Sequence, residues 1–203
     1  HKLGWKISAN DDLVQMWLGT GPQIDGLGHL GEDGEFYNCH QGKDFAAITG
    51  LTKLDISQIP PMVARGVLID VAKHLGVSHL SAAQPISTQD LQSAMTEQKI
   101  TVREGDVILL HTGYTDAFLE ADPQLWGSTI PGITNDAARF LASLKPLAVG
   151  ADTWGLGAVP PAPGDKVFYD HAILLKQNGI YILETMNTGR LAAEAVNEFM
   201  FVL

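Results

Sequence analysis

The chain has 203 residues, of which 45% are hydrophobic and 18% charged, which fits one globular domain with a sizeable core. Its net charge of −10, with 13 Lys and Arg scattered along the chain, excludes the basic patch that nucleic acids require and disfavours an anionic membrane surface. The single cysteine excludes an internal disulfide and a cysteine-based zinc cluster.

The first half of the chain contains three segments with clear periodicity. The segment "MVARGVLIDVA" (62–72) is a continuous apolar run rich in Val, Leu and Ile, which predicts a buried strand. The segment "STQDLQSAMTEQ" (87–98) begins with cap-type residues and then places apolar residues at helical spacing, which predicts an amphipathic helix. The segment "GDVILLHTG" (105–113) is a strand bounded by glycines.

The second half continues with helices predicted over 134–145, 168–179 and 189–199 and strands over 146–152 and 180–185. A Pro- and Gly-rich loop covers 155–165, and Gly179 stands in the C′ position of its helix. Helices and strands are mixed without strict alternation, so we expect an α/β or α+β domain around a mixed sheet.

The whole chain, 1–203, is predicted to be a single domain. It opens on "HKLGWKISANDD" and stops on the strand-like "EFMFVL", so we expect segments to be missing at both ends. No apolar run of the given sequence approaches the ~20 residues of a membrane span, and we expect no signal peptide. We therefore expect a cytoplasmic protein with neither a membrane nor a nucleic acid as its partner.

The segment "QIDGLGHLGED" (23–33) places Gln23, Asp25 and His29 within seven residues of a glycine-rich stretch. Two interpretations compete: a solvated surface loop in which Asp25 forms an Asx turn, and a metal-binding loop. The second needs further ligands from elsewhere, and the best distant candidates are His171 and Glu184.

Glu184 follows four apolar residues in a predicted core strand, where a carboxylate is costly to bury unless it is paired or binds a cation. His171 lies on a helix with many apolar neighbours, so it is either a hydrogen-bonded structural histidine or a functional one. If Gly179 reverses the chain, the helix and the returning strand run side by side, and the side chains of His171 and Glu184 lie next to each other.

Two further polar residues end predicted strands. Asp152 lies where carboxylates often gather around an active site, and it can equally cap the next turn. His111 can support a site or serve structure alone. The sequence contains neither a G-x-S-x-G nucleophile elbow nor a phosphate-binding P-loop.

Five segments in order resemble the cyclase family of metal-dependent hydrolases, which includes bacterial kynurenine formamidase, isatin hydrolase and trans-dienelactone hydrolase. They are "QIDGLGHLGEDGEFYN", "ARGVLIDVAKHLGV", "VREGDVILLHTGYTD", "VGADTWG" and "DHAILLKQNGIYILET". The likeness runs from about residue 13 to the end of the chain.

The resemblance assigns roles to individual residues. In the family motif H-x-G-T-H-x-D-x-P-x-H, the aspartate matches Asp25 and the last histidine matches His29. The later metal-binding glutamate matches Glu184, and the catalytic histidine matches His171.

The sequence departs from this motif at three positions. The middle histidine becomes Gln23, the first falls on Gly19 or Trp17, and the proline becomes Leu27. Because two imidazole ligands are lost, we expect one ion held by Asp25, His29 and Glu184 with help from Gln23. This oxygen-rich set suits Mn²⁺ or Zn²⁺, with Mn²⁺ favoured.

The resemblance implies an enzyme that opens an amide or lactone bond of a small cyclic or aryl substrate, with His171 as general base. Trp17, Trp154 and Tyr37 are candidates for the walls of the substrate pocket. The alternative is a non-catalytic relative that has lost its metal and binds a small molecule or a partner subunit. The resemblance also implies a homo-oligomer, dimeric or larger, and a swivelling β/β/α domain whose mixed sheet closes toward a barrel with flanking helices.

Overall fold

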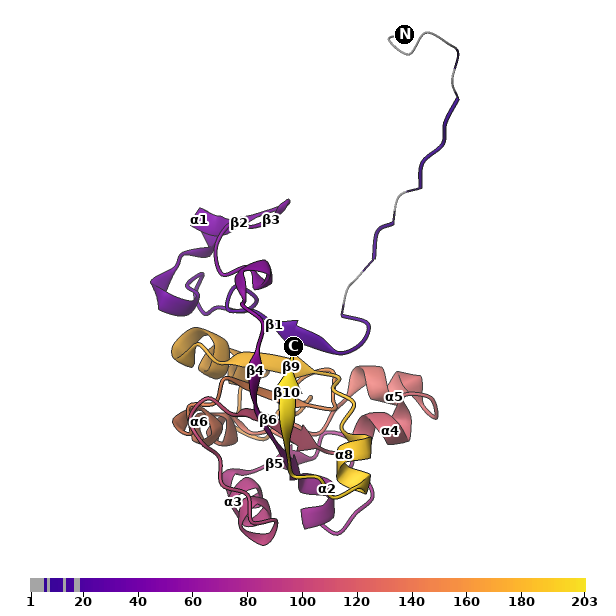
Figure 1. Ribbon diagram of the computed structural model, residues 1–203, viewed down its shortest axis with the longest axis vertical. Coiled ribbons are helices and arrows are strands. Elements are labelled where there is room, and N and C mark those ends of the chain that lie inside the picture. Colours follow the sequence, from indigo (N-terminus) through magenta and orange to yellow (C-terminus); the bar gives the residue numbers. More distant parts are fainter. Residues whose placement is uncertain (1–5, 7, 13, 17–18) are drawn as a thin grey trace.

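The computed structural model describes residue 6 and residues 8–12, 14–16 and 19–203 (Figure 1). Its centre is a six-stranded mixed sheet in the order β1-β9-β8-β6-β4-β10. These strands are β1 (Gln23–Asp25), β4 (Val63–Asp70), β6 (Val107–His111), β8 (Ala148–Ala151), β9 (Tyr181–Glu184) and β10 (Glu198–Val202). Two small two-stranded sheets pair β2 (Ala46–Ala47) with β3 (Gly50–Leu51) and β5 (Pro85–Ile86) with β7 (Gly132–Ile133).

The four central strands β4, β6, β8 and β9 run parallel, and the edge strands β1 and β10 run antiparallel to them. The mixed α/β fold with flanking helices is therefore confirmed. Among the described strands β1 and β10 are not paired with each other, so the sheet is open and barrel closure stays a prediction.

Helices flank the sheet (Figure 1). They are α1 (Gly42–Phe45), α2 (Val71–His74), α3 (Thr88–Glu97), α4 (Tyr114–Phe118), α5 (Pro123–Ser128), α6 (Asn135–Ser143), α7 (Tyr169–His171) and α8 (Gly189–Ala193). Short 3₁₀ turns are η1 (Tyr37–Cys39) and η2 (Ile56–Gln58), and the π-helical segment η3 (Ala172–Gln177) directly continues α7. No helix of the described residues has the length and apolar character needed to cross a membrane.

Alternation along the strands divides the core between the two faces of the sheet. One face presents residues such as Val67, Ile108 and Val149 to α2, α3, α6 and η3. The opposite face presents Leu68 and Leu109, which pack with other apolar residues and with α8. The central strands are apolar on both faces because both faces are covered, as the continuous apolar run in 62–72 predicted.

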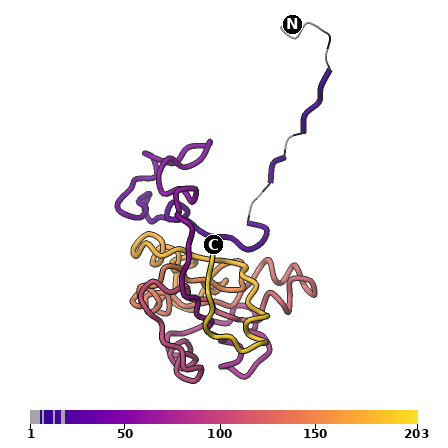
Figure 2. The backbone as a smooth tube through the Cα atoms, in the orientation of Figure 1, coloured from indigo at the N-terminus to yellow at the C-terminus, as the bar shows by residue number. Residues whose placement is uncertain are grey.

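Most predicted elements are confirmed, with bounds shifted by one or two residues. Ser87 caps α3 in a capping box with Asp90, as the cap-type residues indicated. The helix predicted over 189–199 is shorter, because α8 ends at Ala193 and the chain then enters β10. The strand-like C-terminal residues pair with β4, and the tube view shows the yellow C-terminal segment running beside the purple segment that forms β4 (Figure 2).

Candidate metal centre

The edge strand β1 brings the first group of polar side chains to the sheet. Gln23 lies opposite Glu184 in the antiparallel register, and Asp25 lies opposite Ile182. Because residues two apart on a strand share a face, Gln23, Asp25 and Glu184 all point to the helix-covered side. This register places the early loop and the C-terminal strand in one site.

The glycines after Asp25 return the chain over its own carboxylate. The His29 amide donates to the Gly26 carbonyl at 2.9 Å, and the Gly28 amide donates to the Leu54 carbonyl at 3.2 Å. A Cβ on Gly28 would lie 3.0 Å from that same Leu54 oxygen, so the close approach requires glycine. The turn carries the half-exposed His29 ring to Asp25, with Nε2 3.9 Å from Oδ2.

The helix that ends at the Gly179 turn supplies His171. Gly179 has φ +66°, and the chain reverses there from η3 into β9. As predicted from this reversal, His171 and Glu184 meet: Nε2 lies 3.2 Å from Glu184 Oε1 and 3.6 Å from Asp25 Oδ2. Both side chains are buried.

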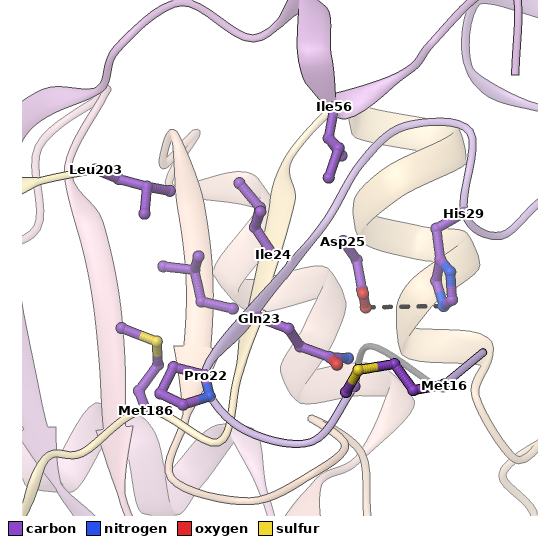
Figure 3. A pocket seen from close by; sticks show the side chains of 11 residues that line it. Met16, Pro22, Gln23, Ile24, Asp25, His29, Ile56, Met186 and Leu203 are labelled. Atoms are coloured by element: carbon purple, nitrogen blue, oxygen red, sulfur yellow. Dashed lines mark ion pairs between the residues drawn. The ribbon is translucent and has the colours of Figure 1, made fainter. Parts of the chain in front are cut away.

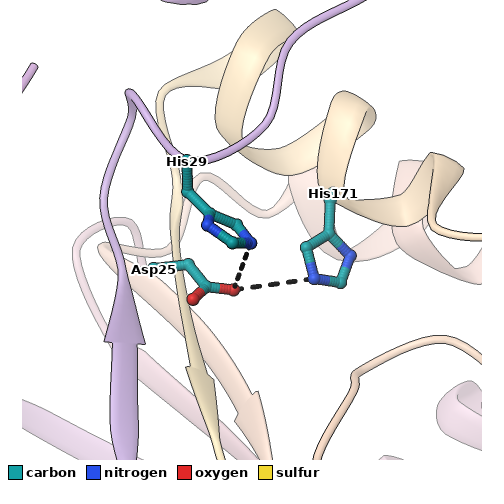
Figure 4. A group of neighbouring side chains, drawn as sticks. All are labelled: Asp25, His29 and His171. Carbon is teal, nitrogen blue, oxygen red and sulfur yellow. Dashed lines mark ion pairs between the residues drawn. The ribbon is translucent and has the colours of Figure 1, made fainter. Parts of the chain in front are cut away.

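Asp25, His29 and His171 each offer one ligand atom, and these three atoms lie within 4.8 Å of one another (Figure 4). Glu184 borders this group and is bonded on both oxygens, because Gln23 Nε2 donates to Oε2 at 2.7 Å and His171 lies at Oε1. The structure thus brings together five polar residues, which are Gln23, Asp25, His29, His171 and Glu184. The first and last of them are 161 residues apart in the sequence.

The buried carboxylates of Asp25 and Glu184 shift the pKa values in this group. Burial, followed by the charge of Glu184, raises the pKa of Asp25 to about 6. Burial lowers the pKa of His171, but hydrogen bonds to Asp170 and Glu184 and the charges of both carboxylates outweigh it and raise this pKa to about 10. The imidazolium is then the charge that compensates its carboxylate neighbours.

One atom of this group indicates a cation. Asp25 Oδ2 is buried and has no hydrogen-bond partner among the residues that the structure describes, although two imidazole nitrogens face it. A buried carboxylate oxygen without a partner is costly, and a divalent ion satisfies it. Carboxylate oxygen and imidazole nitrogen are ligands that both Zn²⁺ and Mn²⁺ accept, so the residues present fit one such ion.

The two pKa shifts predict how the stability of metal-free protein depends on pH. Both pKa values are raised above their unfolded values, so the folded state retains protons that the unfolded chain releases. The free energy of unfolding should therefore fall as pH rises, first between about 4 and 6 through Asp25 and then between about 6.5 and 10 through His171. The Asp25 contribution is about 3 kcal/mol for its two-unit shift.

Chemical denaturation of chelator-treated protein at a series of pH values measures this dependence. Saturating Mn²⁺ or Zn²⁺ should flatten or reverse the slope, because a bound cation favours the deprotonated ligands. Stability of the metal-free protein that rises steadily from pH 5 to pH 9 would contradict the assignment.

A cavity of about 630 Å³ opens beside the group (Figure 3). Gln23, Asp25 and His29 border one part of it, and apolar side chains including Met186 and Leu203 border the rest. Because consecutive residues of β1 point to opposite faces yet line the same space, the cavity passes around the outer edge of that strand.

The remaining predicted site residues lie elsewhere. Trp17 lies outside the described residues. Tyr37 packs against Gly179, where a Cβ would lie 2.6 Å from the Tyr37 ring. Trp154 donates its indole N–H to the Trp126 carbonyl at 2.6 Å. Neither Tyr37 nor Trp154 lines the cavity, so their substrate contacts stay a prediction.

The two residues at strand ends form a separate buried cluster. Asp152 Oδ1 accepts hydrogen bonds from the Thr112 amide at 2.9 Å and hydroxyl at 2.8 Å, and burial raises the pKa of Asp152. His111 Nδ1 lies 2.8 Å from the hydroxyl of Thr188 and 3.9 Å from Asp152 Oδ2. These contacts tie the ends of β6 and β8 to the loop after β9.

The sequence analysis missed Asp170. Its carboxylate lies 2.9 Å from Nδ1 of His171, and both residues are buried. The available signal was an acidic residue directly before a candidate histidine in "FYDHA".

Solved structures similar to this chain are described as cyclases and hydrolases. A novel cyclase is 27% identical with a TM-score of 0.81, and the match covers 95% of this chain and 64% of that one. A potential metal-dependent hydrolase with cyclase activity is 21% identical (TM-score 0.52, covering 84% of this chain and 64% of that one). An isatin hydrolase bound to the product analogue thioisatinate is also 21% identical (TM-score 0.55, covering 87% and 63%).

This chain therefore spans slightly less than two thirds of the length of these three structures. A search of curated proteins finds no match. The Cyclase family model matches residues 3–158, which is most of the sequence. Together with the shared fold, this match shows that the chain belongs to the cyclase family.

Proposed function

We propose that this protein is a metal-dependent hydrolase that opens an amide or lactone bond of a small cyclic or aryl substrate. The observation that carries the proposal is the buried Oδ2 of Asp25, which has no hydrogen-bond partner in the described part of the chain and which two imidazoles face from separate segments. The descriptions of similar structures as a metal-dependent hydrolase and an isatin hydrolase support the same reaction class.

We assign the ion to Asp25, His29 and Glu184, with Gln23 as a neutral fourth group. The ion is Mn²⁺ or Zn²⁺, and when bound it supplies a Lewis acid for the carbonyl and a lowered pKa for water. Gln23 would use its carbonyl oxygen for this purpose while its amide N–H continues to orient Glu184.

His171 is the proposed general base, and it acts in its neutral form: a cation bound to Asp25 and Glu184 would offset the carboxylate charge that raises the pKa of the ring in the metal-free protein. Its Nε2 accepts a proton from water as the water oxygen bonds to the carbonyl carbon. The same nitrogen returns the proton to the leaving nitrogen or oxygen when the C–N or C–O bond breaks, so the reaction consumes one water and leaves a carboxylic acid. The buried contacts of Nε2 with Glu184 and Asp25 keep the ring directed toward the proposed metal ligands.

The cavity beside the metal centre supports an uncharged substrate. No Lys or Arg belongs to the described residues that line it, and the net charge of the chain is −10. An anionic molecule would therefore gain no pairing with Lys or Arg among these lining residues and would be repelled by the net charge at long range. The protein's partners are accordingly proposed to be a neutral small molecule and a second copy of the chain, in the homo-oligomer expected from the family.

Removal of the metal tests the proposal. Purified protein should hydrolyse at least one member of a panel comprising an N-formyl arylamine, a cyclic amide such as isatin and an aryl-substituted lactone. Treatment with EDTA should abolish turnover, and addition of Mn²⁺ or Zn²⁺ should restore it. Full turnover after verified metal removal would contradict the proposal.

A non-catalytic role is the second candidate, and one contact favours it. The Gln23 amide already satisfies Glu184 at 2.7 Å, as a cation would in a metal-loaded site. Metal titration distinguishes the two functions. At a metal concentration 100 times Kd, an authentic site raises Tm by about 5–10 °C. No rise in Tm and no metal in the purified protein would favour the non-catalytic role.

A further inference from the structure

Asp170 and His171 make a contact that a helix does not normally allow. The two residues are consecutive in α7, and consecutive side chains diverge by about 100° around a helix axis. Nevertheless Asp170 Oδ2 lies 2.9 Å from His171 Nδ1, and the two side chains are only 2% and 4% exposed. Something outside the helix must therefore hold the carboxylate beside the ring.

The loop between β8 and α7 supplies this support. A Cβ built on Gly157 would lie 2.7 Å from Asp170 Oδ1 and 3.0 Å from its Cγ, so the loop backbone rests directly against the carboxylate. Gly157 is itself fixed by a bridge to Ile133, whose amide donates to the Leu156 carbonyl at 3.0 Å. Asp170 is thus confined between a bare stretch of backbone and the imidazole.

We propose that Asp170 is a positioning residue that fixes both the ring orientation and the tautomer of His171. An ionised carboxylate accepts hydrogen bonds and donates none, so the Nδ1 that faces it carries the proton. In the neutral ring the lone pair is then on Nε2, the atom that faces Asp25 and Glu184. Gly157 serves the same purpose, because only a residue without a side chain leaves room for this carboxylate.

The catalytic consequence rests on the proposed hydrolase function, but the tautomer does not. Either use of Nε2, as a base or as a metal ligand, requires its lone pair to be free. Removing the carboxylate that partners a metal-binding histidine typically lowers metal affinity or activity by about 10–100-fold, and we expect a loss of activity of the same size for a base held in the same way. We expect removal of the Asp170 carboxylate to lower kcat by a factor in this range.

Asp170→Asn is the first test. The nitrogen NMR shifts of His171, assigned by their loss in His171→Gln, should report Nδ1–H in the wild-type protein loaded with Zn²⁺. In Asp170→Asn the amide can donate to Nδ1, and a substantial Nε2–H population should appear. At saturating metal kcat should fall about 10–100-fold with little change in KM, whereas the affinity for Zn²⁺ should stay near the wild-type value because His171 is not one of the assigned ligands.

Gly157→Ala is the second test, because it removes no polar group. Its added methyl displaces the Asp170 carboxylate, so it should shift the tautomer and lower kcat in the same direction as Asp170→Asn. Asp106→Asn is the matched control: Asp106 is a buried carboxylate that pairs with Arg65 at 2.7 Å before β6 begins, at the far end of the strand from the metal centre. It should lower Tm and leave the His171 spectrum and kcat unchanged.

The proposal is overturned if Asp170→Asn retains the wild-type tautomer of His171, or if Asp106→Asn alters that tautomer equally. If the wild-type protein hydrolyses none of the panel, the proposed function fails alone, since the NMR result still decides the role of Asp170.

Discussion

Replacing Asp25 by Asn is expected to abolish metal binding and hydrolysis while making the metal-free protein more stable. The Asp25 carboxylate is the charged ligand on β1. Its loss should therefore reduce turnover by more than the ~10–100-fold typical of losing a residue that only hydrogen-bonds a metal ligand. The same carboxylate is a buried charge whose pKa is raised to about 6 by burial and by Glu184. At pH 8 its ionised form opposes folding in the absence of metal, and a neutral amide removes that penalty.

The expected gain is up to about 3 kcal/mol in the free energy of unfolding of chelated protein at pH 8, from the two-unit pKa shift. Chemical denaturation with and without EDTA measures this gain, and calorimetric titration measures the loss of metal binding. Asp136→Asn removes an exposed partner of Arg139 on α6 and is a control for the loss of one negative charge. If Asp25→Asn is less stable than the wild type in the presence of chelator, the ionised carboxylate does not destabilise the metal-free fold and this prediction is wrong.

Replacing His171 by Gln has the second large effect. Removal of a general base lowers kcat by about 10²–10⁴-fold. If His171 acts only on protons, the variant retains its metal, because Asp25, His29, Glu184 and Gln23 remain. Metal content of the purified variant, compared with kcat at saturating metal, therefore separates its possible roles.

His29→Gln is the matched substitution for this comparison. His29 and His171 both face Asp25 Oδ2, at 3.9 Å and 3.6 Å. Under the proposed assignment His29→Gln loses metal affinity and His171→Gln loses kcat. The reverse outcome would exchange the two histidines, making His171 the ligand and the exposed His29 the base.

The fold could be predicted from the sequence where local chemistry is decisive. Ser87 and Gly179 mark a helix start and a helix end because capping and left-handed backbone depend on the residue itself. The strand β1 was not predicted, because three residues between glycines carry no periodicity. Its conformation comes from pairing with β9, far away in the chain.

The site shows the same division. The meeting of His171 with Glu184 followed from one glycine turn between a helix and a strand, which is local geometry. The position of Tyr37 did not, since its ring packs on Gly179 through tertiary contact. Asp170 was overlooked because neighbours on a helix rarely touch, and the loop that forces this contact lies more than ten residues away.

The placement of β1 at the edge of the sheet affects how an ion enters and leaves. This strand has three residues and pairs, among the described strands, with β9 alone, whereas the central strands are held on both sides. Short edges open at a small fraction of the free energy of complete unfolding. A cation can therefore exchange when β1 briefly separates from β9, while the helix that bears His171 and the parallel strands remain folded.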